Sequence, residues 1–267
     1  MLKQRVITAL VIAPIVLALV FFAPGWLFAL AMLLMALVGA WEWSALAGRP
    51  GRDSRLALVA LFAMLAVGGW FLQASFPYPR VLAGYCWLAL AWWLFSLAWI
   101  AAWRGEFPRP VKMLCGVLTL LPSLAAVVAV RATSPWYLLI LLLLTTSADI
   151  GAYFAGRAFG RRKLAPLVSP GKTWEGVGGG VAGVVLVAVV ASHWLPVNPG
   201  PFILICICVA LISVVGDLSE SLFKRQAGLK DSGALFPGHG GVLDRVDSLT
   251  AAAPLYWLGL RWLGLLP

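Results

Sequence analysis

The stretch PWYLLILLLLTTSADIGAYFAG, from Pro135 to Gly156, contains a single charged residue, Asp149. A helix needs about 20 mostly apolar residues to cross the hydrocarbon core of a bilayer. Apolar runs of similar length recur along the whole chain, which is the pattern of membrane-spanning helices. The sequence therefore predicts an all-α polytopic integral membrane protein.

The composition supports this class. Of the 267 residues, 62% are hydrophobic and 11% are charged, and the mean hydropathy is +0.96. Soluble domains carry about 25% charged residues. There is too little polar material here to cover a water-facing globule of this size.

Nine spans are expected, separated by segments rich in proline and glycine. They cover about 6–23, 25–43, 56–73, 81–103, 112–130, 135–156, 176–195, 201–223 and 248–266. We expect a region of five spans over 1–134 and a catalytic region of four spans over 135–267. The first run extends to Phe22 without a small-x-small cleavage site, so it is interpreted as a retained helix and not a signal peptide.

The distribution of positive charge predicts the orientation. The net charge is +10, but the lysines and arginines lie in short loops, which argues against nucleic acid as a partner and favours contact with anionic headgroups. With the N-terminus in the cytoplasm, 17 of the 20 basic residues lie on the cytoplasmic side and 3 lie opposite. Those three are Arg80, Arg131 and Arg261. This asymmetry favours an odd number of spans.

The acidic residues follow a different distribution. Seven of the ten fall between residues 149 and 247, several of them within spans or at span ends. Acidic residues contribute little to orientation, whereas ionisable groups at membrane depth are expensive and usually functional. We expect these carboxylates to belong to a site.

The four cysteines, in contrast, are interpreted as apolar packing residues. Cys86, Cys115, Cys206 and Cys208 all lie in apolar runs. On a helix, Cys206 and Cys208 would point about 200° apart, which disfavours a shared metal. No disulfide framework is implied.

Three segments could carry chemistry. The first, SADIGAYFAGRAFGRRKLAPLVSPGKTWEG (147–176), contains Asp149, glycines suited to close helix packing, four basic residues, and a Ser-Pro-Gly turn before Lys172. Such a turn at the start of a helix is a plausible phosphate cradle. It lacks the P-loop spacing, and a basic loop that serves only orientation is the alternative.

The second segment is GDLSESLFKR (216–225). On a helix, Asp217, Glu220, Ser221 and Lys224 share one face. A stripe of carboxylates suits a hard divalent cation, which prefers oxygen ligands. A solvated helix end with an i, i+4 pair between Glu220 and Lys224 is the alternative.

The third segment is FPGHGGVLDRVDS (236–248). Its glycines would let the backbone approach a ligand closely. Asp247 or Ser248 could instead cap the last helix, whereas Asp244 has no such explanation. Together the three segments supply carboxylates, cations and a flexible loop, which are the components of phosphoryl or nucleotidyl transfer. They also converge on one membrane face, so we expect a substrate with a lipid end and a polar end.

Residues 221–247, SLFKRQAGLKDSGALFPGHGGVLDRVD, resemble the pattern of the phosphatidate cytidylyltransferases, also called CDP-diacylglycerol synthases. That pattern is Ser-x-apolar-Lys-Arg, then Lys-Asp and a small residue, then Pro-x-His-Gly-Gly, then apolar-x-Asp-Arg-apolar-Asp. The segments DIGAYFAGRAFG and SPGKTWEG are also similar to that family. The specific resemblance covers about 147–248, whereas the N-terminal half matches only in hydropathy and in Glu42.

The resemblance implies a reaction in which CTP and phosphatidate give CDP-diacylglycerol and pyrophosphate. It also implies Mg²⁺ as cofactor with K⁺ as a possible companion, a homodimer, and a bacterial inner membrane with the site facing the cytoplasm. A CTP-dependent polyprenol kinase and an ion-coupled transporter are the alternatives. The transporter is less favoured because the acids gather at one face.

The resemblance also implies residue roles. The carboxylates expected to bind metal are Asp217 and Asp244 first, then Asp149, Glu220 and Asp247. The cations expected to neutralise phosphates are Lys172, Lys224, Arg225 and Arg245. The groups expected to hold a substrate or close around it are Ser221, Lys230, His239, Gly240 and Gly241. The catalytic set among these is Asp217, Asp244, Lys224, Arg225, Arg245 and His239.

Overall fold

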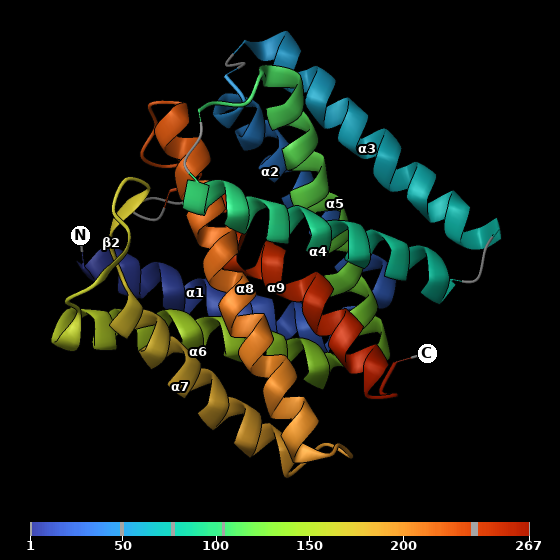
Figure 1. The fold of residues 1–267 in the computed structure, drawn as a ribbon. Helices are drawn as coiled ribbons and strands as arrows, with labels where there is room; N and C mark the ends of the chain where they lie inside the picture. The colour runs from blue at the N-terminus through green and yellow to red at the C-terminus, as the bar shows by residue number, and fades with distance from the viewer. Residues whose placement is uncertain (1, 49–50, 76–77, 103–104, 236–239, 267) are drawn as a thin grey trace.

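The computed structural model describes residues 2–48, 51–75, 78–102, 105–235 and 240–266 (Figure 1). Within these ranges the chain forms nine helices and one short hairpin. The helices are α1 (Leu2–Phe21), α2 (Gly25–Leu46), α3 (Arg52–Ser75), α4 (Tyr78–Ala102), α5 (Arg109–Thr133), α6 (Pro135–Phe159), α7 (Trp174–Ser192), α8 (Pro199–Gln226) and α9 (Leu243–Trp262). The hairpin strands are β1 (Lys163–Ala165) and β2 (Ser169–Thr173).

The helices confirm the predicted class of an all-α polytopic membrane protein. Six of them, α2 and α4 to α8, are long and apolar enough among the described residues to cross a bilayer. The helix α9 carries four charged residues, Asp244, Arg245, Asp247 and Arg261. Each predicted span coincides with a helix, but nine membrane crossings stay a prediction.

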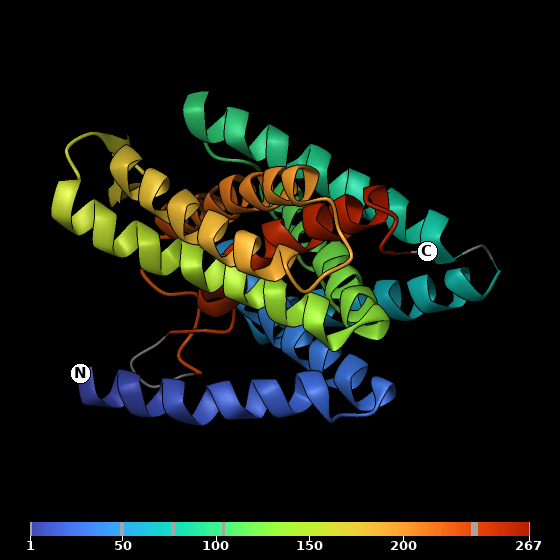
Figure 2. The ribbon, with the colours of Figure 1, turned by 90° about the horizontal axis from the view of Figure 1, so that it is seen from below.

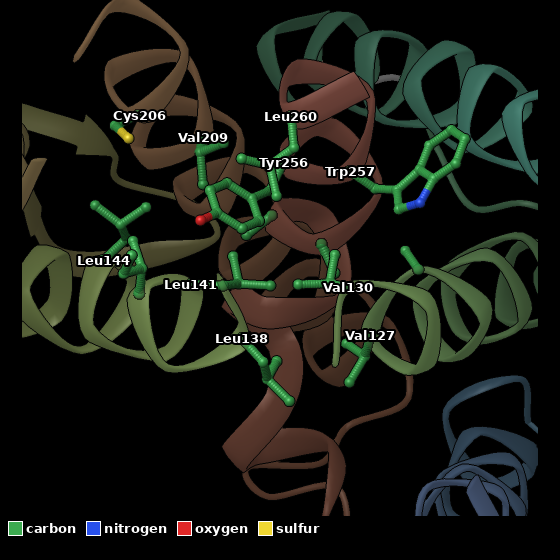
Figure 3. Close-up of a cluster of buried hydrophobic side chains, with 14 of the residues drawn as sticks. Val127, Val130, Leu138, Leu141, Leu144, Cys206, Val209, Tyr256, Trp257 and Leu260 are labelled. Carbon is green, nitrogen blue, oxygen red and sulfur yellow. The ribbon is translucent and has the colours of Figure 1, made fainter. Parts of the chain in front are cut away.

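The helix α9 lies inside the bundle and packs against α2, α4, α5, α6 and α8. Figure 1 shows α9 behind the crossing helices α4 and α8, and Figure 2 shows α1 along the outer edge of the bundle. A core cluster around Leu141, Val209 and Tyr256 joins α6, α8 and α9 (Figure 3). Because α9 is surrounded, its N-terminal end is fixed by several neighbours at once.

The helices α6 and α7 approach each other through glycines. A Cβ atom added at Gly151 would collide with the carbonyl oxygen of Gly179, and one added at Gly179 would collide with Ala155. The prediction of close helix packing at Gly151 is therefore confirmed. The contact brings the backbones of α6 and α7 together beside the hairpin that joins them.

The hairpin was not predicted. The strands β1 and β2 pair antiparallel, with Lys163 opposite Thr173 and Ala165 opposite Ser169. The predicted Ser-Pro-Gly turn is wrong, since Ser169 to Gly171 lie in β2 and the chain reverses before them, where the Val168 amide bonds the Ala165 carbonyl at 3.1 Å. The predicted helix start after this segment is confirmed, because Thr173 caps α7 by accepting from the Gly176 amide at 3.1 Å.

Hydrogen bonds from the end of α8 join it to two neighbouring segments. On the predicted cytoplasmic side, Arg225 donates to the carbonyl of Val168 at 3.4 Å, and Gln226 donates to that of Gly105 at 3.3 Å. These contacts join the end of α8 to the hairpin and to the loop before α5. Three of the segments that the charge count assigns to one side therefore lie together.

Two of the three basic residues predicted on the opposite side have structural partners there. Arg131 donates to the carbonyls of Val20 and Ala23, at the end of α1. Arg261 donates to the carbonyl of Pro79 at 2.7 Å, at the start of α4. A guanidinium can satisfy free carbonyls at helix ends and loops, and both arginines do so here.

The cysteines are free thiols. Cys86, Cys115 and Cys206 are buried, as expected for packing residues, whereas Cys208 is exposed. The opposite environments of Cys206 and Cys208 agree with the predicted divergence of the two side chains on one helix.

Candidate active site

A cavity of about 620 Å³ opens between α6, α7, α8, α9 and the hairpin. Its polar lining includes Asp149 from α6, Lys172 from β2, Asp217 from α8 and Ser248 from α9. The remaining lining is largely apolar and includes Val177, Val181, Ala210 and Val214. The volume is in the range of about 300–1,000 Å³ typical of small-molecule sites, and the lining combines a charged part with an apolar part.

Lys172 and Asp217 form an ion pair at this cavity. One helical turn after Asp217, Ser221 donates a long hydrogen bond of 3.4 Å to the Asp217 carboxylate. The structure thus brings together three residues that the sequence predicted for the site. The predicted common face of α8 is confirmed for Asp217 and Ser221.

The helices α8 and α9 meet closely at the level of these carboxylates. A Cβ atom added at Gly216 would lie 2.6 Å from the Asp247 carbonyl oxygen. Such an approach is open only to glycine, and it places the acidic stretch of α8 directly beside the start of α9. The second and third predicted segments are therefore adjacent in the fold.

Lys224 forms ion pairs with acidic residues of both segments. Its Nζ lies 2.7 Å from Asp244 Oδ1 and 3.1 Å from Glu220 Oε1. The i, i+4 pair with Glu220 is therefore present, as the alternative interpretation of α8 predicted. Lys224 also reaches α9, however, so the lysine belongs to the buried cluster and not to a solvated helix end.

Asp244 is held on both carboxylate oxygens. Besides Lys224 on Oδ1, its Oδ2 accepts from the amides of Ser232 and Gly241, at 2.9 and 2.8 Å, and from the Ser232 hydroxyl at 2.9 Å. Burial raises the pKa of this carboxyl, but the hydrogen bonds from Lys224, Gly241 and Ser232 outweigh it and lower the pKa to about 2. These contacts therefore favour the ionised form of Asp244.

The glycines before α9 approach carboxylates closely, as their flexibility predicted, but these carboxylates belong to the chain itself. Gly240 has a φ of +77°, and a Cβ atom there would lie 2.5 Å from Asp244 Oδ2. A Cβ atom at Gly241 would collide with the Glu42 carboxylate and the Ser232 hydroxyl. The close approach expected toward a ligand is thus made toward Asp244 and Glu42.

The predicted capping role of Asp247 or Ser248 is wrong. The helix α9 begins at Leu243 and not near residue 248, so both residues lie inside it. The amides at the start of α9 are instead bound by a residue of α2, because the Glu42 carboxylate accepts from the amides of Val242 and Leu243, each at 3.0 Å. A carboxylate from another helix takes the place of a local cap.

Glu220 and Asp247 line a second, much smaller cavity of about 10 Å³ between α2, α4, α5, α8 and α9. Trp93 and Ser219 also line it. Glu220 is buried, and its side chain is held by Lys224. These two acids therefore belong to the interior beside the larger cavity, and not to the lining that they were expected to share with Asp217.

The other predicted cations lie at the surface. Arg225 is exposed and bonds the hairpin through Val168, and Arg245 and Lys230 are also exposed. Of the predicted basic residues that the structure describes, Lys172 alone is among the residues lining the large cavity. His239 lies outside the described residues.

Sequence reasoning left four residues out of the predicted site. Tyr153 and Arg157 line the cavity, and Arg157 donates to the Tyr153 hydroxyl at 2.9 Å. Both follow Asp149 at steps of four residues, so helical spacing alone could have placed them on the same face. Glu42 was visible as an acid near the end of a span, whereas Ser232 entered the pattern only as a small residue.

The carboxylates at the cavity suit a magnesium ion whose other ligands come from water and a substrate. Among the described residues, no group of three or more His, Cys, Asp or Glu side chains forms a metal cage. Asp149 and Asp217, however, line one cavity from separate helices. Mg²⁺ usually takes one or two carboxylates and completes its shell with water and substrate phosphates, so this donor set suits it.

Comparison with known proteins covers nearly the whole chain. Residues 3–263 match the sequence model of the cytidylyltransferase family. A phosphatidate cytidylyltransferase of Pseudomonas aeruginosa is 42% identical over 98% of this chain and 97% of its own length. One from Haemophilus influenzae is 39% identical over 96% and 97%, and one from Brucella suis is 36% identical over 96% and 92%.

Proposed function

The chain belongs to the cytidylyltransferase family, and we propose that it transfers the cytidylyl group of CTP to phosphatidate, giving CDP-diacylglycerol and pyrophosphate. The similarity to phosphatidate cytidylyltransferases extends over nearly the whole of both chains. The observation that carries the proposal is the shared cavity of Asp149, Lys172 and Asp217, whose lining becomes apolar away from these charges.

The cavity suits both substrates. Its charged part, at the hairpin and the C-terminal halves of α6 and α8, would hold the triphosphate of CTP beside Lys172. Its apolar part follows α7 and α8 through Val181 and Ala210, toward the depth where the acyl chains of phosphatidate lie. A lipid phosphate at the boundary would thus lie near the nucleotide.

The reaction needs little covalent chemistry from the protein. A phosphate oxygen of phosphatidate attacks the α-phosphorus of CTP, and the bond from that phosphorus to the bridging oxygen breaks as pyrophosphate leaves. The attacking oxygen is already anionic, so no general base is required. The protein contributes positioning and charge stabilisation, which dominate catalysis in transfers at phosphorus.

Each of these residues has a proposed role that follows from its position. Lys172 would weaken its ion pair with Asp217 and pair with the CTP phosphates. Arg157 lines the same cavity. Asp217 is the first candidate for a metal ligand, followed by Asp149. Asp244 Oδ1 would become a third ligand if a metal ion displaced Lys224 from it. A bound Mg²⁺ would neutralise charge on the CTP phosphates and on the leaving pyrophosphate.

A companion K⁺, the cytoplasmic orientation of the site and a homodimer remain part of this proposal. The grouping of the hairpin with the end of α8 supports the orientation, because both carry positive charge. The bacterial relatives support a location in the inner membrane.

Labelled CTP tests the function directly. Purified protein in detergent is incubated with phosphatidate, Mg²⁺ and CTP labelled at either the α- or the γ-phosphorus. The proposal expects the α-label in a lipid product and the γ-label in pyrophosphate. A γ-label in lipid would instead identify a lipid kinase, and label in neither product would reject both enzymes.

A further inference from the structure

Glu42 lies near the end of α2, in the half of the chain that lacks the site motifs, yet it contacts the segment before α9. The residue is 5% exposed. Its Oε1 accepts from the amide of Val242, and its Oε2 accepts from the amide of Leu243 and the hydroxyl of Ser232, each at 3.0 Å. Three donors from the site segment thus converge on one buried carboxylate.

These donors explain how α9 can begin in the protein interior. The first amides of a helix lack intrahelical partners and carry a partial positive charge. Val242, at the N-cap position, provides no side-chain cap. An anionic side chain from α2 therefore satisfies these amides and fixes the direction in which α9 starts.

Ser232 links this carboxylate to the site. Its hydroxyl lies 3.0 Å from Glu42 Oε2 and 2.9 Å from Asp244 Oδ2. The hydroxyl has one proton and can donate to only one of the two carboxylates at a time. Glu42 and Asp244 are thereby coupled through one shared group, while Lys224 holds the other oxygen of Asp244.

The backbone around Glu42 leaves no room for side chains. A Cβ atom at Gly233 or Gly241 would collide with the Glu42 carboxylate. The chain therefore wraps closely around this carboxylate on both sides of the loop. Such crowding fixes the position of the segment better than hydrogen bonds alone.

We propose that Glu42 is a positioning residue for the active site. It holds residues 240–244 so that Asp244 and Lys224 keep a fixed place beside Asp217 and the cavity. This inference rests on the proposed cytidylyltransferase function, since that function makes Asp244 a candidate metal ligand.

The substitution Glu42→Gln tests the inference, because an amide of the same shape presents an N–H₂ group where acceptors are needed. We expect kcat to fall by about 10- to 100-fold, the usual effect of losing an outer-shell partner, while KM for phosphatidate changes by less than about twofold. Hydrogen exchange, read by mass spectrometry on peptides covering 240–244, should accelerate locally. Exchange in α6 and α7 should not change.

Ser123→Ala is the matched control. The buried Ser123 hydroxyl of α5 lies 2.5 Å from the Thr250 carbonyl and thus also tethers α9, but farther along the helix. We expect it to lower the melting temperature and leave kcat unchanged. A second variant, Ser232→Ala, keeps Glu42 and removes the link, and its effect on kcat should not add to that of Glu42→Gln.

Different results would reject the positioning role of Glu42 and the proposed enzymatic function. If Glu42→Gln matches Ser123→Ala, with a lower melting temperature and wild-type kcat, Glu42 is only structural. If Glu42→Gln does not fold, a wild-type kcat in Ser232→Ala rejects the positioning role. If the wild-type protein makes no CDP-lipid, the proposed function fails, and unchanged exchange at 240–244 in Glu42→Gln would still reject the positioning.

Discussion

Lys172, at the end of the hairpin, forms an ion pair with Asp217 on α8, and both residues line the large cavity. Neither side chain is fully buried, since 25% and 29% of the two side chains are exposed. The pair is therefore accessible to a ligand, and a triphosphate that enters the cavity would compete with Asp217 for the lysine. We expect charge exchange at this pair to accompany CTP binding.

Replacing the lysine tests this expectation. In Lys172→Ala we expect kcat/KM for CTP to fall by about 10²- to 10³-fold, as for the loss of one preorganised group that stabilises developing charge. Steady-state kinetics with CTP as the varied substrate measure the effect. Lys163→Ala is the control, because Lys163 is exposed in the same hairpin. Equal losses in both variants would show that only the net charge of the hairpin matters.

The acid of the pair is expected to be required for a different reason. Asp217→Asn should abolish Mg²⁺-dependent turnover while the melting temperature in detergent stays near that of the wild type, and EDTA should silence the wild-type protein. The control is Glu106→Gln, which alters an exposed acid paired with Lys112. Activity in Asp217→Asn at the wild-type Mg²⁺ requirement would refute the metal assignment.

The glycine contact between α6 and α7 offers a test of stability. Gly179→Ala places a methyl group against Ala155 and should destabilise the protein by about 1–3 kcal/mol, the usual cost of overpacking. Gly178→Ala is the matched control on the same helix, since nothing lies within 4 Å of its added Cβ atom. Thermal unfolding in detergent should separate the two variants, and equal melting temperatures would argue against the close packing.

Labelling of single cysteines tests the orientation. In a background without Cys208, which is exposed, Arg162→Cys should react with an impermeant maleimide only from the cytoplasmic face. Pro196→Cys, in the loop between α7 and α8, should react only from the opposite face. Both sites are exposed, so accessibility does not confound the comparison. Reaction of both from the same side would contradict the alternation of helices.

Much of the site was predictable because it depends on local spacing. Asp217 and Ser221 are one helical turn apart, and α8 brings them to one face as the sequence indicated. The same rule could have placed Tyr153 and Arg157 beside Asp149. The capping role proposed for Asp247 was wrong because α9 begins before it, at Leu243, and Val242 at the N-cap position makes no side-chain cap hydrogen bond.

The sequence by itself determined the membrane class, the positions of the helices and the residues that carry charge. Apolar runs and positive loops act through the bilayer, which is the same solvent for every helix. Only the tertiary structure decided which charges meet. The pairs Lys172–Asp217, Lys224–Asp244 and Glu42–Val242 join distant segments, and their formation depends on how closely glycines such as Gly216 and Gly241 let neighbouring backbones approach. Contacts of this kind follow from packing in three dimensions, which no local pattern of residues specifies.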